Sequence, residues 1–177
     1  MVRHADPRRD AAACAEIYAP NVVPGPASFE EEPPGAHEMA ERIATSARAY
    51  PWLVAERDGR VAGYACGAEH RSRAAYRWAV DVTVYVDPSL YRSGVGRQLY
   101  EALLPLLARQ RLHVACAGIA LPNDPSIGLH EALGFELVGV YRDIGFKGGR
   151  WRSVGWWQKR LLPAGAPEEP LEPQRLP

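Results

Sequence analysis

The stretch "LYRSGVGRQLYEALLPLL", Leu90 to Leu107, decides the fold because it joins a glycine-rich turn to an amphipathic helix. The residues just before it, "VDVTVYVDP" (80–88), are rich in β-branched side chains and end at Asp87-Pro88, so they predict a strand. Helix N-termini carry unpaired N–H groups and the positive end of the helix dipole, and glycine lets an anion approach the backbone closely. This order of strand, turn and helix therefore predicts a phosphate site.

The flanking patterns predict an α+β fold. We expect helices from Asp6-Pro7 to Pro20 and from about Ala36 to Arg48. Two apolar runs flank Asp58-Gly59, which predicts an antiparallel hairpin over residues 52–67. The apolar run "HVACAGIA" (113–120) is typical of a covered parallel strand, and a short helix capped by Ser126 and two final strands, "FELVGVY" and "SVGWWQKRL", follow it. The expected sheet is mixed, with antiparallel N-terminal strands, a parallel β-α-β core and flanking helices.

Composition bounds the class of protein. The 177 residues predict one domain over residues 1–162, followed by a Pro/Glu-rich disordered tail over residues 163–177. Basic and acidic residues balance at 21 each, and no apolar stretch is long enough to span a membrane. We therefore expect a small-molecule substrate and neither nucleic acid nor membrane as a partner. Three widely separated cysteines predict reduced thiols in the cytoplasm, without zinc or disulfides.

Two common phosphate loops are ruled out by their spacing. A Walker A loop needs Gly-Lys followed by Ser or Thr, and neither Gly94 nor Gly96 precedes such a pair. A Rossmann turn needs a third glycine where Leu99 stands, and an acidic residue near the position of Cys116. The remaining interpretation is a ligand whose pyrophosphate is held by the loop amides and whose other part lies along a splayed strand.

The residues resemble the GCN5-related N-acetyltransferase superfamily. Its signature [QR]-x-x-G-x-[GA] is matched by residues 91–96 except at Tyr91. Within the superfamily the chain is similar to phosphinothricin and methionine sulfoximine N-acetyltransferases, in "YPWLVAE", "DGRVAGYA", "RSRAAYRW", "LPNDPSIGLHEALGF" and "VGWW". The resemblance implies a homodimer that uses acetyl-CoA and no metal. It implies transfer of the acetyl group to the α-amino group of a small amino acid, by direct attack in a ternary complex.

The resemblance also implies the catalytic groups. An acid in a strand more often lies on a solvated face, but Asp81 stands where the family has a glutamate that accepts the proton of the substrate ammonium. Aspartate is one methylene shorter, which favours a relay through water. His130 stands where related enzymes carry a tyrosine or histidine for proton transfer or substrate contact, although a lone histidine on a short helix is usually structural.

Binding residues follow from the same resemblance. Contacts to acetyl-CoA are predicted for two sets, the strand and turn residues Val84, Tyr85, Val86, Tyr91, Arg92, Ser93, Gly94, Val95, Gly96 and Arg97, and the helix-start residues Asn123 and Ser126. Contacts to the amino acid are predicted for Phe29, Arg71, Arg73 and Tyr76, where guanidinium groups suit a carboxylate or phosphinate. We expect the arginines of "RSRAAY" to project the same way if that stretch is extended. Other large aromatic residues are interpreted as core or dimer-interface groups, namely Tyr64, Trp78, Trp151, Trp156 and Trp157.

Two alternatives stay open at this stage. In the first alternative, the acetyl acceptor is another amine, such as a protein N-terminus, a polyamine or an aminoglycoside. A polyamine or an aminoglycoside would be better bound by an acidic pocket than by Arg71 and Arg73. The second is a non-catalytic module that binds acyl-CoA, against which Asp81 and His130 argue. Arg152-Ser153 departs from the His-Asp of the resembling resistance enzymes, so the exact amino acid is open.

Overall fold

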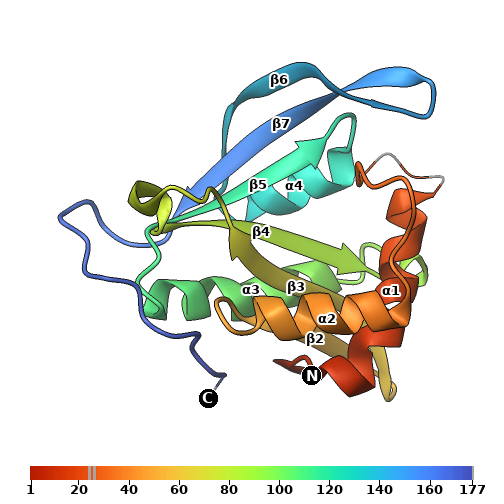
Figure 1. Cartoon of the computed structure of the whole chain (residues 1–177), viewed down its shortest axis with the longest axis horizontal. Coiled ribbons are helices and arrows are strands. Elements are labelled where there is room, and N and C mark those ends of the chain that lie inside the picture. The colour runs from red at the N-terminus through yellow and green to blue at the C-terminus, as the bar shows by residue number, and fades with distance from the viewer. Residues whose placement is uncertain (24, 26, 177) are drawn as a thin grey trace.

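A seven-stranded mixed sheet forms the centre of the molecule (Figure 1). The computed structural model describes residues 1–23, 25 and 27–176. The strand order is β1-β2-β3-β4-β5-β7-β6, and only β4 and β5 are parallel. The strands are β1 (Val2–His4), β2 (Trp52–Arg57), β3 (Arg60–Glu69), β4 (Ala79–Val86), β5 (Val114–Ala120), β6 (Glu136–Lys147) and β7 (Arg150–Arg160). This confirms the α+β prediction. The short strand β1 was not predicted, because three residues carry no readable periodicity.

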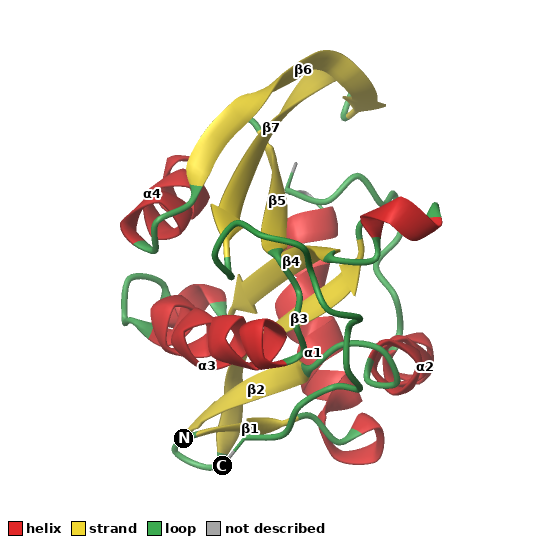
Figure 2. Ribbon diagram, turned by 90° about the vertical axis from the view of Figure 1, so that its left-hand side faces the viewer, coloured by secondary structure: helices red, strands yellow, loops and turns green. Residues whose placement is uncertain are grey.

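Helices cover both faces of the sheet, with α1 and α2 on one face and α3 on the other, and α4 beside β5 (Figure 2). Their bounds are α1 (Pro7–Val22), α2 (Ala36–Ser46), α3 (Val95–Arg109) and α4 (Asp124–Ala132), with 3-10 turns η1 (Ala74–Tyr76) and η2 (Pro88–Leu90). Asp6 caps α1 as predicted. The prediction that Pro20 ends α1 is wrong. Pro20 lies in the last turn, where it removes one backbone hydrogen bond without ending the helix, and the side-chain amide of Asn21 donates to the Ile17 carbonyl at 3.1 Å.

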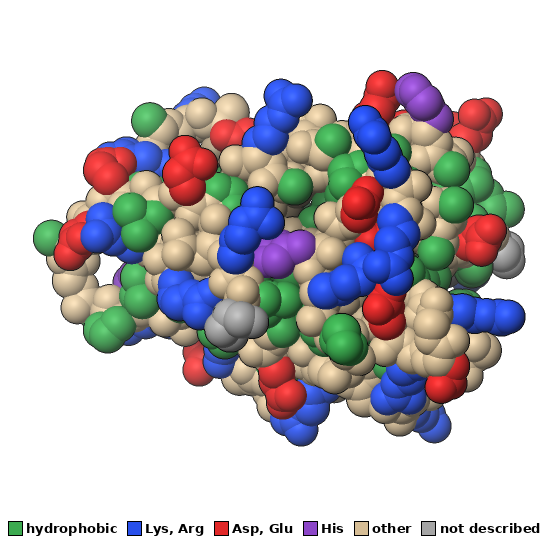
Figure 3. Space-filling model, turned by 90° about the horizontal axis from the view of Figure 1, so that it is seen from below, with side chains coloured by type: hydrophobic (Ala, Val, Ile, Leu, Met, Phe, Trp, Pro, Cys, Tyr) green, Lys and Arg blue, Asp and Glu red, His purple; other side chains and the backbone are tan. Residues whose placement is uncertain are grey.

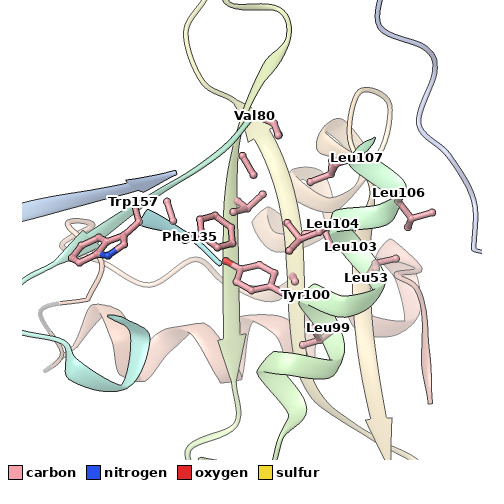
Figure 4. Packing of buried hydrophobic residues seen from close by; sticks show 14 of the residues in the cluster. Leu53, Val80, Leu99, Tyr100, Leu103, Leu104, Leu106, Leu107, Phe135 and Trp157 are labelled. Carbon is pink, nitrogen blue, oxygen red and sulfur yellow. The ribbon is translucent and has the colours of Figure 1, made fainter. Parts of the chain in front are cut away.

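The two faces of the sheet have separate apolar clusters. Leucines of α3 pack on the sheet through Leu99, Leu103 and Leu107, with Tyr100 and Phe135 next to them (Figure 4). The opposite cluster joins α1 and α2 to Tyr64. The alternation predicted for β4 is confirmed, because its valines face α3 whereas Asp81, Thr83 and Tyr85 face the α1–α2 side.

Strands β4 and β5 separate after a short paired region. Only Ala79–Asp81 pairs with Val114–Cys116, whereas β4 stays paired with β3 up to Val86. Alternate backbone groups of residues 82–86 therefore point toward β5 without a ladder partner. The separation makes an opening through the sheet, with Asp81 and Cys116 at its apex.

The predicted hairpin turn at Asp58-Gly59 is confirmed, and a second tight turn joins β6 to β7. Asp58 and Gly59 have φ of 50° and 74°, as the tight turn between β2 and β3 requires. Gly148 and Gly149 have φ of 61° and 73° between β6 and β7. The β6–β7 hairpin extends away from the helices at the top of Figure 1.

The segment after Pro163 contains no helix or strand in its described residues. It runs back along the domain to end near the N-terminus (Figure 1), with exposed ion pairs from Arg77 to Glu169 and from Arg111 to Glu168. Its disorder stays a prediction. Basic and acidic side chains are interspersed over the face drawn in Figure 3, in keeping with the balanced composition. Among the described residues, no helix combines the length and the apolar character that crossing a bilayer requires.

Candidate active site

A cavity of about 1020 Å³ occupies the opening between β4 and β5. Residues 82–86 and 117–120 form its strand walls, and the start of α3 and the start of α4 close its sides. The predicted contacts to acetyl-CoA line it, namely Val84, Tyr85, Val86, Tyr91, Arg92, Gly94, Val95, Gly96, Arg97, Asn123 and Ser126. Ser93 is the exception. Its hydroxyl donates to the Leu90 carbonyl at 2.6 Å, and its carbonyl accepts from Arg57.

The glycine turn serves two geometric needs. Gly94 precedes α3 with φ of 85°, a left-handed conformation that glycine adopts without strain. Gly96 packs against α4, because a Cβ built there would lie 3.1 Å from Leu129 Cδ2. The first amides of α3 have no carbonyl partner within the helix and stand at the cavity wall. Unpaired amides followed by an open strand edge suit a pyrophosphate followed by a thin amide-containing chain, which is the shape of a CoA ester.

The start of α4 is capped by Asn123 and not, as predicted, by Ser126. The Asn123 side-chain oxygen accepts from the Ser126 amide at 3.2 Å, because Asn123 has the non-helical backbone of an N-cap. The Ser126 hydroxyl lies 3.5 Å from His130 Nδ1 and stays at the cavity wall.

His130 borders the cavity from α4 and is 3% exposed. Its Nδ1 lies 2.7 Å from the Ser126 carbonyl, which can only accept, so we assign the ring proton to Nδ1. Its Nε2 lies 3.1 Å from the Tyr100 hydroxyl, which then donates to it. Burial lowers the pKa of His130 despite the Ser126 carbonyl, so the ring is neutral near pH 7. Both nitrogens are therefore engaged.

Asp81 lies on the face of β4 that is turned away from α3, at the apex of the opening. It stands across from Ala68 on β3 and beside Cys116 on β5. Its Oδ1 lies 2.6 Å from Nδ1 of His70. Burial raises the pKa of Asp81, while His70 and Arg71 act in the other direction.

His70 was not predicted from the sequence, because it belongs to no motif. Only the strand register brings it near Asp81, by placing Ala68, two residues before His70, opposite Asp81.

Aromatic rings surround Asp81 on this face of the sheet, which we call the acceptor side. Trp156 covers Gly118, whose added Cβ would lie 3.2 Å from the Trp156 ring. Its centroid lies 5.9 Å from that of His70, and Arg71 Cζ lies 5.8 Å from the Trp156 centroid. Trp156 was interpreted as a core or dimer-interface residue. It is partly exposed and contacts the groups around Asp81, so it is not a core residue, and a place in a dimer interface stays a prediction. Tyr64 and Trp157 are buried core residues, as interpreted.

Of the four residues predicted to bind the amino acid, two lie near Asp81 or His70 and two do not. Arg71 lies near Asp81, and the Tyr76 ring lies 5.9 Å from that of His70. Arg73 is exposed and makes no described side-chain hydrogen bond. Arg71 and Arg73 were expected to project the same way if "RSRAAY" were extended. That condition is not met, because the stretch bends into η1. No described contact joins Phe29 to Asp81.

Phe29 lies on a loop held against the β6–β7 hairpin. Its ring contacts Gly145, where a side chain would collide with it. Lys147 Nζ donates to the carbonyl oxygens of Val22, Ser28 and Glu30, each at 2.7 Å. Three carbonyl partners and the Phe29 ring therefore fix the loop beside the hairpin.

Cys116 completes the polar cluster at the apex. Polar atoms of His70, Asp81 and Cys116 all lie within 4.8 Å of one another. Burial raises the pKa of Cys116 to about 11, so the group is a thiol near pH 7. The three cysteines are free, as predicted. That the reaction needs no metal stays a prediction.

Comparison with known proteins gives the family. Residues 4–156 match the model of the acetyltransferase (GNAT) domain family. The chain belongs to the GNAT acetyltransferases. It is 41% identical to a phosphinothricin N-acetyltransferase of Streptomyces viridochromogenes, over 93% of this chain and 89% of that protein. It is 35% identical to an L-methionine sulfoximine/L-methionine sulfone acetyltransferase of Salmonella typhimurium, over 94% of this chain and 98% of that protein.

A solved GNAT structure shares the fold and holds the acetyl donor. The phosphinothricin acetyltransferase of Sinorhizobium meliloti, in complex with AcCoA, superposes with a TM-score of 0.85 at 36% identity. The match covers 90% of this chain and 87% of that one. The family and these relatives confirm that this GNAT chain is an acetyl-CoA-dependent N-acetyltransferase.

Proposed function

We propose that this GNAT enzyme acetylates the α-amino group of a small amino acid with an anionic or strongly polar side chain. Phosphinothricin, methionine sulfoximine and methionine sulfone are the amines we expect. The observation that carries the proposal is the place of Arg71, a guanidinium beside Asp81 and Trp156 at the apex of the strand opening. A cation next to the proton acceptor suits an amine that carries its own carboxylate.

The donor side supplies binding and orientation. The first amides of α3 would hold the pyrophosphate, and the open edge of β4 would hold the pantetheine chain. Backbone N–H groups near residues 84–86 would polarise the thioester carbonyl where negative charge develops. His130 and Tyr100 fix the start of α4 at the thiol end of the cavity. Because both nitrogens of His130 are engaged, we favour a positioning role for it over proton transfer.

The acceptor side supplies the proton acceptor. Amine attack on a thioester needs a free lone pair, so the ammonium must first lose a proton. Asp81 is the carboxylate at the apex, and its raised pKa makes it a stronger base than an ordinary aspartate. Attack then proceeds directly in the ternary complex.

We also propose a homodimer that acts in the cytoplasm. The β6–β7 hairpin supports the dimer, because it exposes apolar side chains on both strands, among them Val138, Ile144, Phe146 and Trp151. The three free cysteines are in keeping with a reducing compartment.

A thiol-release assay with a panel of amines tests the substrate class. We expect turnover with methionine sulfoximine, methionine sulfone and phosphinothricin to exceed that with a polyamine, an aminoglycoside or a peptide N-terminus. Faster turnover with polyamines would contradict the amino-acid assignment and leave the acetyltransferase chemistry intact. CoA release with no amine of the panel, together with tight acetyl-CoA binding, would favour a non-catalytic module.

A further inference from the structure

We propose that His70 is a catalytic residue that takes the proton from the substrate ammonium, and that Asp81 orients the imidazole. The inference deepens the proposed function, on which it rests for the class of amine. It divides between two residues the role that sequence analysis gave to Asp81 alone.

Strand register brings the two side chains together. Ala68 on β3 stands opposite Asp81 on β4, and His70 follows two residues later on the same side of the chain. His70 therefore stands beside the apex at which β4 and β5 separate.

The hydrogen bond between them assigns their roles. Asp81 Oδ1 lies 2.6 Å from His70 Nδ1, a short hydrogen bond with a carboxylate as acceptor. A carboxylate can only accept, so Nδ1 carries the proton and Nε2 keeps its lone pair. Nε2 makes no hydrogen bond within the described part of the chain. The dyad therefore presents one basic nitrogen, oriented by a carboxylate, as in other catalytic histidine–aspartate pairs.

The surroundings limit solvent without enclosing the pair. The side chains of His70 and Asp81 are 17% and 28% exposed. Tyr76 and Trp156 contact the imidazole edge to face, at centroid distances of 5.9 Å each. The contacts fix the orientation of the ring, and the pair stays partly accessible to solvent.

Two charged or titratable groups lie beside the dyad on its own face of the sheet. Arg71 follows His70 in the chain, and Cys116 lies on β5. Glu69 and Tyr50 lie on the other face, where Tyr50 packs beside Gly67 and Val80. Arg71 is the one cation among them, and it opposes the second positive charge that protonation of His70 brings. Asp81 compensates that charge directly.

The proton balance needs no further reagent. His70 Nε2 accepts one proton from R–NH3⁺, and the imidazolium is stabilised by the Asp81 carboxylate. The free amine forms the N–C bond at the thioester carbonyl carbon, and the C–S bond breaks to release CoA thiolate. The second amine proton goes to the thiolate, and the imidazolium returns its proton to water.

The test compares His70→Gln with wild type and with His37→Gln, an exposed histidine on α2. Steady-state kinetics are measured with the amine that gives the highest wild-type turnover, so failure of the amino-acid assignment leaves this test intact. We expect His70→Gln to lower kcat about 10²- to 10⁴-fold, the usual size for loss of a general base, with the KM for acetyl-CoA unchanged. His37→Gln should match wild type.

Three further readouts distinguish proton transfer from packing. The wild-type pH profile of kcat should show a loss of activity toward acid pH that His70→Gln lacks. Added imidazole should restore part of the activity of His70→Ala. The double variant His70→Gln/Asp81→Asn should be no slower than His70→Gln, because the two residues act as a unit.

Retention of kcat within about threefold in His70→Gln, with the loss of activity toward acid pH unchanged, would overturn the proposal and leave Asp81 as the base. Acetyl-CoA binding and circular dichroism identify a misfolded variant. If His70→Ala misfolds, His70→Gln decides the question, since its side chain can still bond to Asp81. An additive loss in the double variant would also contradict the dyad.

Discussion

The two faces of β4 are built by different means. On the α3 side the donor cavity is made of backbone amides, a glycine turn and valine side chains. On the α1–α2 side the acceptor region is made of polar and aromatic side chains from β3, β4, β5, β7 and the loop before η1. The first face is built mainly from the contiguous residues 82–97, joined by the end of β5 and the start of α4. The second needs several distant segments in register.

This difference predicts how substitutions should act. Changes on the acceptor face should affect the chemical step and the amine, because each side chain there has its own role. Changes on the donor face should affect acetyl-CoA binding through backbone geometry, and by smaller factors. Both expectations are open to measurement with single variants.

The largest effect is expected for Asp81→Asn. It should lower kcat about 10²- to 10⁴-fold and keep acetyl-CoA affinity, because a neutral amide at this position would neither accept the ammonium proton nor orient a basic imidazole. Burial raises the pKa of Asp81, so its charged form is disfavoured in the folded state, and the variant should not lose melting temperature at about pH 8. Steady-state kinetics and thermal melts check both. Wild-type turnover in the variant would remove Asp81 from the mechanism.

Arg71→Ala should come second. A charge-assisted hydrogen bond to a desolvated anion contributes about 1.5 to 3 kcal/mol, so kcat/KM for methionine sulfoximine should fall roughly ten- to a hundredfold. Arg73→Ala serves as the comparison and should lose less, because Arg73 lacks the contact with Trp156 that Arg71 has. The KM for acetyl-CoA should barely change in either variant. If both variants had wild-type kinetics, we would conclude that the two arginines belong to a solvated surface and do not bind the amino acid.

Gly96→Val should raise the KM for acetyl-CoA several-fold. The added side chain meets Leu129 at 3.1 Å and crowds the first turn of α3, so the loop amides move from their positions around the pyrophosphate. Gly128→Val on α4 is the matched control, because an added Cβ there has no neighbour within 4 Å. Normal CoA binding by a folded Gly96→Val protein would make the loop purely structural.

His130 should give a smaller, pH-dependent effect on stability. Its folded pKa lies below the unfolded value of about 6.5, so its stabilising contribution is present above that pH and is lost as pH falls toward the folded pKa. The melting temperature of wild type should therefore drop more than that of His130→Gln between about pH 7.5 and pH 5.5. Parallel melting curves in the two proteins would contradict the burial of a neutral imidazole.

Deletion of residues 163–177 should have the smallest effect. The ion pairs of Glu168 and Glu169 with the domain are exposed, and such pairs contribute little to stability. Activity and melting temperature should stay nearly unchanged, as calorimetry and the thiol-release assay can show. A loss of several degrees would mean that the contacts of the segment with the domain, such as the packing of Leu176 on the α3 cluster, contribute to stability, or that the segment packs on a partner subunit.

The sequence by itself determined the donor face. The alternation of Val80, Val82 and Val84 with Asp81 and Thr83 gives the face of each β4 side chain, because strand periodicity is local. The glycine turn is equally local, since Gly94 adopts a positive φ where the pattern placed the start of a helix. Local geometry and the family resemblance were enough there.

Only the tertiary structure decided the acceptor face. His70 reaches Asp81 through the β3–β4 register, and Trp156 reaches the same place because β7 inserts between β5 and β6. Pairing between distant strands depends on packing of the whole sheet, and no spacing in the chain records it. The cap of α4 shows the same limit on a smaller scale, because Asn123 and Ser126 are both suitable residues and backbone conformation chose between them.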